Sequence, residues 1–151
     1  MHSLAGLLHV PFGVPALDYR DLLRVTRLLT RDERQVTEAY RRACFNVLAH
    51  NRDDHPRNIA FLMSASGRWA LAPAFDLTPS HGPGGEHAMS VLGEGLPTKK
   101  TLARLGEEAR VADAGHALKQ VEHGLSRLAA VARRLGVPPP LAARLTRLLT
   151  A

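Results

Sequence analysis

Two side chains in the segment RDDHPRN, residues 52–58, have types and spacing that suit chemistry. Asp53 supplies a carboxylate and Asn58 an amide five positions later, in a charged run whose Pro56 does not continue a helix. A short loop can aim a carboxylate at an attacking hydroxyl and still turn back to place an amide oxygen on a metal ion. Hard cations such as Mg²⁺ prefer oxygen ligands of this kind. The pair therefore indicates proton transfer beside a bound cation.

A second acidic residue, Asp76, follows 23 positions after Asp53 in the segment PAFDLTPS. Protein kinases use this order of residues. A catalytic-loop Asp accepts the proton of the substrate hydroxyl, an Asn five positions later binds Mg²⁺, and another Asp binds Mg²⁺ after the next strand pair. Each match alone is weak, but their order and spacing together favour phosphoryl transfer.

Two amphipathic helices are predicted ahead of the charged loop. Apolar spacing predicts a helix over residues 18–29 capped by Asp18, and Thr30 followed by Glu33 predicts a capping box for a helix over 31–49. We expect the apolar stripe of the second helix to be buried; it comprises Val36, Ala39, Tyr40, Ala43, Cys44, Val47 and Leu48. Within that stripe Cys44 is expected to be a small hydrophobe and not a reactive thiol.

The loop is followed by a predicted hairpin and then by further helices. Short apolar segments at 59–63 and 69–72, separated by SASG, predict the hairpin, and the Pro- and Gly-rich residues 73–87 predict irregular structure. Beyond them we expect a short helix from Thr98, a long helix over about 112–135, and a last helix beginning in PPP at 138–140. The predicted fold class is mainly α with a small β-hairpin.

Length and composition fit one domain, or one lobe of a larger protein, because the chain has 151 residues, 45% of them hydrophobic and 23% charged. Its single cysteine cannot form an intrachain disulfide, which excludes the disulfide-stapled secreted classes. No apolar run approaches the roughly 18–20 residues that cross a bilayer. We therefore expect a cytoplasmic protein with no membrane partner.

The formal charge of +6 suggests an anionic partner at first sight. The basic residues are, however, spread as 7, 5 and 8 over 1–50, 51–100 and 101–151, against 5, 5 and 4 acidic ones, and they form no polybasic run. This distribution is typical of a solvated surface, so we expect no direct nucleic-acid binding.

Four segments in order resemble the C-terminal region of HipA-like serine/threonine kinases, the toxins of bacterial toxin–antitoxin modules. They are SLAGLLHV with the following PALDY (3–10 and 15–19), FNVLAHNRDDHPRNIAFLM (45–63), GRWALAPAFDLTPS (67–80) and GGEHAMSVLGEG (84–95). The resemblance covers almost the whole chain and weakens after about residue 110. It implies a protein-kinase-like C-terminal lobe.

The same resemblance implies roles for single residues and for small molecules. Asp53 would be the catalytic base, Asn58 and Asp76 the Mg²⁺ ligands, and His55 a support of the loop. Arg57 stands where the family usually has Lys, which keeps a positive charge near the phosphates but offers a forked donor. The implied reaction is phosphate transfer from ATP to a protein serine or threonine, and an antitoxin is an implied partner.

One part of the family pattern is absent. The family's complete enzymes carry an N-terminal lobe with a phosphate-covering loop and a nucleotide-contacting Lys, whereas the only glycine cluster here, HGPGGEH at 81–87, lies after Asp76. We expect residues 1–151 to form the C-terminal lobe alone, as a truncated or split kinase with little activity without a complementary N-lobe protein.

Two alternatives remain open. A zinc hydrolase would draw on His50, Asp53, Asp54, His55, His81 and His87, although His50 and His55 are five apart instead of four apart on one helical face. A non-catalytic helical module would bind an antitoxin or nucleic acid through a basic face made of Arg127, Arg133, Arg134, Arg144 and Arg147.

Overall fold

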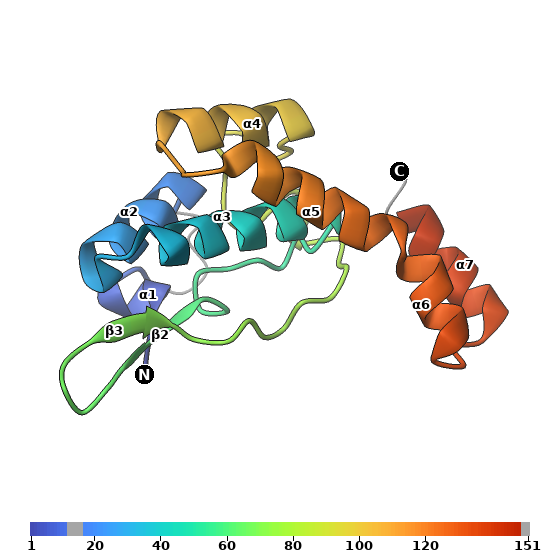
Figure 1. Ribbon diagram of the computed structural model, residues 1–151. Helices are drawn as coiled ribbons and strands as arrows, with labels where there is room; N and C mark the ends of the chain where they lie inside the picture. Colours follow the sequence, from blue (N-terminus) through green and yellow to red (C-terminus); the bar gives the residue numbers. More distant parts are fainter. Residues whose placement is uncertain (12–16, 149–151) are drawn as a thin grey trace.

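Helix α3 (Glu33–Leu48) lies at the centre of the computed structural model, which describes residues 1–11 and 17–148 (Figure 1). Its buried side chains are Val36, Ala39, Tyr40, Ala43, Cys44, Asn46 and Val47. The predicted buried stripe is confirmed except for Leu48, which is half-buried. Because three other helices and the sheet all pack on α3, its C-terminal end gives the following loop a fixed starting point.

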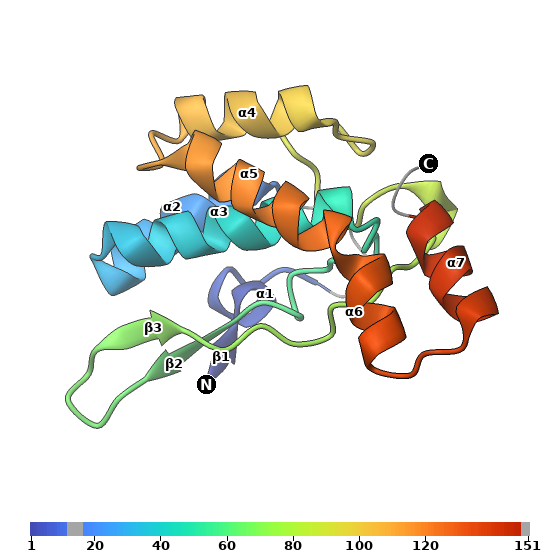
Figure 2. The same cartoon turned by 45° about the vertical axis from the view of Figure 1, so that its right-hand side comes forward.

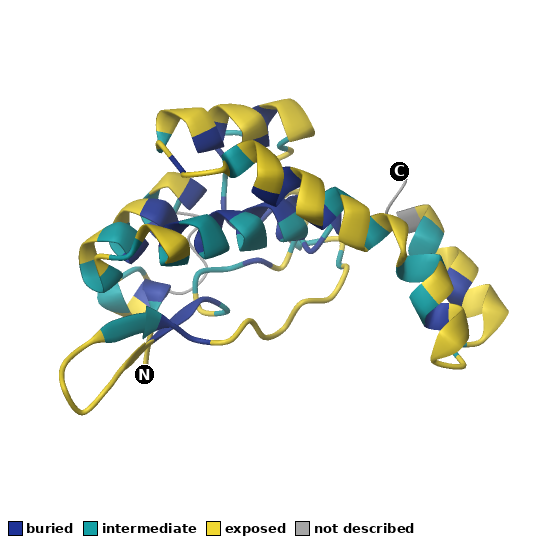
Figure 3. Ribbon diagram, in the orientation of Figure 1, coloured by how far each residue is buried: buried dark blue, intermediate teal, exposed yellow. Residues whose placement is uncertain are grey.

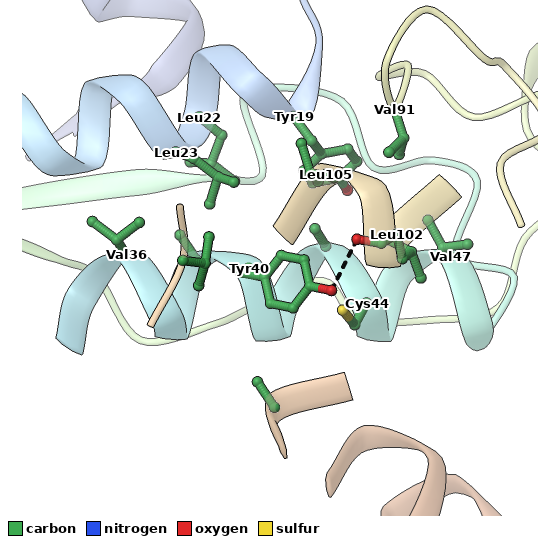
Figure 4. Close-up of a cluster of buried hydrophobic side chains, with 14 of the residues drawn as sticks. Tyr19, Leu22, Leu23, Val36, Tyr40, Cys44, Val47, Val91, Leu102 and Leu105 are labelled. Carbon is green, nitrogen blue, oxygen red and sulfur yellow. Dashed lines mark hydrogen bonds between the residues drawn. The ribbon is translucent and has the colours of Figure 1, made fainter. Parts of the chain in front are cut away.

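Helix α2 (Tyr19–Thr30) packs along α3 and begins as predicted. Asp18 caps it in a reciprocal capping box with Asp21, and its first turn buries Tyr19 and Leu22 (Figure 4). The predicted box between Thr30 and Glu33 is wrong. Thr30 ends α2 instead, because its hydroxyl donates back to the Thr26 carbonyl at 2.8 Å.

A short left-handed connection separates α2 from α3. Arg31 has a φ of 54°, and Asp32 then caps α3 by accepting from the Arg34 backbone N–H at 2.9 Å. The second helix therefore begins at Glu33 and not at residue 31, because Arg31 still belongs to the end of α2.

Helices α4 (Lys99–Glu108) and α5 (Ala114–Ser126) cover another side of α3, and Figure 3 shows their buried faces turned toward it. Thr98 caps α4 as expected, and Leu102 and Leu105 are fully buried. The Tyr40 hydroxyl donates to the Leu102 carbonyl at 2.9 Å, which ties α3 to α4 inside the core (Figure 4).

The sheet is small and antiparallel, with strand order β1-β2-β3. Strands β2 (Ala60–Met63) and β3 (Trp69–Leu71) form the predicted hairpin. The structure adds β1 (His2–Ser3), which pairs with β2 and leads directly into helix α1 (Leu4–Leu7). A strand of two residues has no measurable period, so the sequence pattern did not indicate it.

Helices α6 (Leu128–Arg134) and α7 (Pro139–Leu148) form a hairpin at the end of α5 that lies away from the sheet (Figures 1 and 2). The predicted single helix over 112–135 is wrong, because α5 ends at Ser126 and a separate helix, α6, begins at Leu128 after Arg127. The break follows Gly124 and Ser126, and the Ser126 hydroxyl donates to the His123 carbonyl in place of supporting a longer helix. Leu135, the last residue of the predicted helix, is 72% exposed.

The end of α6 and the start of the last helix agree with the sequence. Gly136 follows α6 with a φ of 72°, and α7 begins inside the Pro-rich segment. Within the described residues, no helix is both long and apolar enough to cross a membrane.

Gly106 lies where α4 packs closely on Ala114 and Tyr40, and a matched pair of glycines tests this packing. A methyl group at this position would lie 2.6 Å from the Ala114 Cβ and 3.1 Å from the Tyr40 ring, whereas Gly124 in α5 has open space around it. We expect Gly106→Ala to lower the free energy of unfolding by about 1–2 kcal/mol. Gly124→Ala should raise it by about 0.5–1 kcal/mol. Urea unfolding of both variants measures the difference, and equal effects would contradict the packing.

Cys44 gives an alkaline pH dependence of stability. Burial raises the pKa of its thiol to about 12 from the ordinary 9.0. Below pH 9 both states keep the proton, and between pH 9 and 12 only the unfolded state releases it, so the free energy of unfolding falls with rising pH. The limiting slope is about 1.4 kcal/mol per pH unit. Urea unfolding between pH 8 and 10 should show a shallower decline for Cys44→Ala, and parallel declines would contradict the burial of the thiol.

Candidate active site

The loop at 50–58 begins where α3 ends, and its own backbone bonds shape it. His50 takes a left-handed φ of 51°, which turns the chain out of the helix. Asn58 then closes the loop, because its backbone N–H donates to the His55 carbonyl at 2.9 Å and its side-chain amide donates to the Asp53 carbonyl at 3.3 Å. The spacing of five between Asp53 and Asn58 thus corresponds to a closed turn.

The N-terminal segment also holds this loop in place, by two backbone hydrogen bonds. The Leu4 N–H donates to the Ile59 carbonyl at 2.8 Å, and the Ala5 N–H donates to the Pro56 carbonyl at 3.1 Å. The loop is therefore held between α3 and the short β1–α1 unit, although these two contacts join residues that are 51 and 55 positions apart in sequence.

Asp76 meets Asn58 in space. The Asn58 amide nitrogen donates to Asp76 Oδ2 at 2.8 Å. Asp76 reaches this place from the irregular segment after β3 with a φ of 55°, a conformation that Asp tolerates better than most residues. Its carbonyl accepts a 3.4 Å hydrogen bond from the buried Asn51 side chain. The structure thus joins Asn58 to Asp76 by their side chains and to Asp53 through the backbone.

The other residues predicted for the site lie in the same loop. The Asp53 side chain is 56% exposed, and His55 Nε2 lies 3.9 Å from its Oδ1, which fits a supporting position for His55. His55 Nδ1 is buried and has no hydrogen-bond partner among the described residues. Arg57 is exposed on the loop. An accessible carboxylate at Asp53 can meet a hydroxyl arriving from solvent.

Asp54 is the residue whose role the sequence did not indicate. Its carboxylate is fully buried and accepts four hydrogen bonds. The Tyr19 hydroxyl at 2.7 Å and His87 Nδ1 at 2.9 Å bond one oxygen, while the backbone N–H groups of Ala88 at 2.9 Å and Met89 at 3.3 Å bond the other. Asp54 therefore joins the loop to α2 and to residues 87–89.

Two buried amides extend these contacts to Asp76. Asn46 donates to the Tyr19 hydroxyl at 2.8 Å, and the Asn51 side-chain amide donates to Asn46 Oδ1 at 3.0 Å and to the backbone carbonyl of Asp76. Burial and then the negative charge of Asp54 raise the pKa of the Tyr19 hydroxyl well above its usual value, so it remains a donor. We call Asp54, Tyr19, His87, Asn46 and Asn51 the anchor network.

Oxygen donors at Asn58 and Asp76 fit a magnesium ion. Their side chains are already within hydrogen-bond distance, so they can share one cation once the amide presents its oxygen. For the zinc alternative, the described part of the chain places no group of three or more His, Cys, Asp or Glu side chains where they could hold a metal. His87 instead bonds Asp54 inside the anchor network.

Two comparisons with known proteins bear on the family and the fold of this chain. The family model of the HipA-like C-terminal domain matches residues 1–137, so the chain belongs to that family. The chain is also similar in structure to a chain in the complex of HipA, HipB and operator DNA from the toxin–antitoxin system of Shewanella oneidensis MR-1. The TM-score is 0.69 at 20% sequence identity, over 93% of this chain and 35% of that chain. A comparison with curated protein sequences finds no match.

The stability of the protein should respond very differently to the same substitution at the neighbouring residues Asp53 and Asp54. Asp54→Asn places an NH₂ group against the donors of the anchor network, so we expect it to lower the free energy of unfolding by about 2–4 kcal/mol. Asp53→Asn changes an exposed side chain and should stay within about 0.5 kcal/mol of wild type. Urea unfolding at neutral pH measures both, and a loss for Asp53→Asn as large as that for Asp54→Asn would contradict the distinction.

Proposed function

We propose that residues 1–151 form the C-terminal lobe of a HipA-like kinase, which transfers phosphate from ATP to a serine or threonine hydroxyl of a protein. The observation that carries the proposal is the contact between Asn58 and Asp76 beside an exposed Asp53. Three separated sequence positions with the order typical of kinases lie within one small region. Membership of the HipA-like family supports the same activity.

In this proposal each residue of the loop has one task. Asp53 accepts a hydrogen bond from the substrate hydroxyl and takes its proton as the bond to phosphorus forms. Asn58 and Asp76 hold Mg²⁺ by oxygen atoms, and Mg²⁺ supplies positive charge against the phosphates of ATP. His55 keeps the Asp53 carboxylate in position, and Arg57 contributes positive charge near the phosphates.

The chain spans 35% of the structural neighbour it matches, so the proposal concerns one lobe of a larger kinase. A nucleotide-binding lobe, on another chain or another part of the same protein, would supply the opposite wall of the ATP site. Positioning provides most of the rate in phosphoryl transfer, so one wall alone gives little catalysis. Since the neighbour is bound to HipB, we also propose an antitoxin as partner.

Metal binding can be tested on the isolated chain with Mn²⁺ as a paramagnetic probe. We expect Mn²⁺ to broaden the NMR signal of the Asn58 side-chain amide selectively. Asp76→Asn removes the only carboxylate that bonds Asn58 among the described residues and should raise the Mn²⁺ concentration needed by about tenfold or more. Asp113→Asn, at an exposed Asp without a side-chain cap bond, serves as the matched control. Equal broadening in all three proteins would contradict the metal assignment.

Turnover tests the complete proposal. Isolated 1–151 should bind ATP weakly and show negligible kinase activity, whereas addition of a complementary lobe should produce phosphorylation. That activity should fall by about 10²-fold or more in Asp53→Asn and persist in Asp113→Asn and Cys44→Ser. Strong phosphorylation by the isolated chain would contradict the need for a second lobe. Activity that survives Asp53→Asn would exclude Asp53 as base. If Asp53→Asn and Asp76→Asn both left every measured property unchanged, the non-catalytic interaction module would be favoured.

A further inference from the structure

The free edge of strand β3 borders a cavity of about 690 Å³ between the hairpin and the junction of α2 with α3. The end of α2 supplies Leu28, Leu29 and its C-cap residue Arg31 to the lining, and the hairpin supplies Arg68 and Trp69. Leu28 is 66% exposed, and Figure 3 shows the hairpin turn as exposed. The cavity is therefore accessible from solvent.

The hydrogen bonds of the hairpin direct part of the β3 backbone away from β2. The Ala72 N–H donates to the Ala60 carbonyl at 2.9 Å, so this pair is hydrogen-bonded across the ladder. Bonded and non-bonded pairs alternate along an antiparallel ladder, which places Leu71 and Trp69 in non-bonded pairs. Their backbone N–H and C=O groups therefore point to the outer edge of the sheet.

The outer edge of β3 is only partly occupied. The Leu71 N–H donates to Gln35 Oε1 at 3.1 Å, and Gln35 is itself part of the cavity lining. The N–H and C=O of Trp69 have the same direction two residues nearer the turn, and no described strand or side chain bonds them there. An open strand edge of this kind is a template on which a second chain can add a strand.

The lining of the cavity carries positive charge that the protein does not neutralise. Arg31 and Arg68 are exposed, and neither forms an ion pair with a carboxylate of the described residues. Asp32, the acidic residue in the described lining, caps α3 and bonds Arg34 at 2.8 Å. Two guanidinium groups are thus left to attract carboxylates from outside the chain.

The same cavity offers apolar surface at Leu28 and at the half-buried Trp69 ring. Successive side chains of an extended peptide point to opposite faces, so it can present carboxylates and apolar groups together while its backbone pairs with β3. We propose that this cavity docks an extended acidic segment of a partner protein, which adds a strand at Trp69. The open strand edge favours a peptide over a nucleic acid, because a nucleic acid lacks the alternating N–H and C=O groups.

The docking surface goes beyond the proposed kinase function. Its described lining residues lie within 28–35 and 67–70, whereas the loop with Asp53 and Asn58 spans 50–58 and Asp76 follows the hairpin. None of the proposed catalytic or metal-binding residues belongs to it. Failure of the kinase assignment would therefore leave this proposal intact.

A synthetic peptide of alternating charge, acetyl-Glu-Val-Glu-Leu-Glu-Val-Glu-amide, is the probe, and the protein is wild-type 1–151. Trp69 is the only tryptophan of the chain, so its fluorescence reports on the cavity directly. We expect a saturable fluorescence change, ¹⁵N shifts at Arg68, Trp69 and Ala70, and weaker binding as NaCl is added. The same peptide with Lys in place of Glu should not bind.

Two N-methylated peptides test the strand pairing. One carries methyl groups on the Glu amides and the other on the Val and Leu amides. Because alternate amides of a strand face the same neighbour, one of the two should bind at least about tenfold more weakly than the parent peptide, while the other should keep its affinity. Equal affinity of both methylated peptides would overturn the pairing with β3.

Substitution of the two arginines tests the charge. The double variant Arg31→Asn with Arg68→Gln should bind the peptide at least about fivefold more weakly. Asn is chosen at residue 31 because it tolerates the left-handed φ of 54°. Arg133→Gln, at an exposed arginine of α6, is the matched control and should bind as wild type.

Four outcomes would overturn the proposal. They are the absence of a saturable Trp69 response in wild type, and unchanged affinity in the folded double variant. The others are tighter binding of an oligothymidylate than of the peptide with the same dependence on the two arginines, which would indicate a nucleic acid, and a Trp69 response to protein concentration alone, which would indicate a second copy of the chain.

Discussion

The buried carboxylate of Asp54 is the interaction on which the geometry of the site depends. A carboxylate removed from water is strongly unfavourable unless donors surround it, and here a hydroxyl, an imidazole and two backbone N–H groups do so. Those donors come from α2 and from residues 87–89, which are distant in sequence from the loop. The need to satisfy one charge therefore fixes the relative positions of three segments, and the loop at 50–58 takes its shape from them.

The anchor network adds buried polar contacts to the apolar packing at the end of α3. Side chains in the middle of this helix are apolar and face α2, α4 and α5, but near its C-terminus Asn46 is buried and directs its amide to Tyr19. From there the hydrogen bonds continue through Asn51 to the backbone of Asp76. A continuous chain of hydrogen bonds thus connects α2 to the backbone of Asp76, which lies outside regular secondary structure.

The sequence indicated the parts of the site that depend on local spacing. Asp53, Asn58 and Asp76 stood out because their order matches a known chemical arrangement, and in the structure the Asn58 amide nitrogen lies 2.8 Å from Asp76 Oδ2. The roles of Asp54 and His87 were not predictable in this way, because the two residues are 33 positions apart and their partnership exists only in the folded chain. Strand β1 was missed for a different reason, because its two residues are too few to show a period.

The errors in the helices have a similar cause. The prediction of one helix over 112–135 carried no information on where that helix would break, and Gly124 with Ser126 weakened it at that point. The sequence pattern of a capping box at Thr30 does not form in the structure. The Thr30 hydroxyl bonds within α2, and Asp32 caps α3 in its place. Local patterns compete, and tertiary packing decides between them.

Arg52, Asp53 and Asp54 are consecutive, yet each meets a different environment. Arg52 is partly enclosed by segment 80–88, Asp53 is exposed, and Asp54 is buried in the anchor network. Since the backbone on both sides of Asp53 is held by its neighbours' contacts, the Asp53 side chain can stay accessible without being mobile in position. A residue that must meet a substrate from solvent needs this combination, and it cannot supply the rigidity itself. Substitutions at Arg52 or Asp54 should therefore alter what Asp53 does although neither side chain touches the reacting hydroxyl.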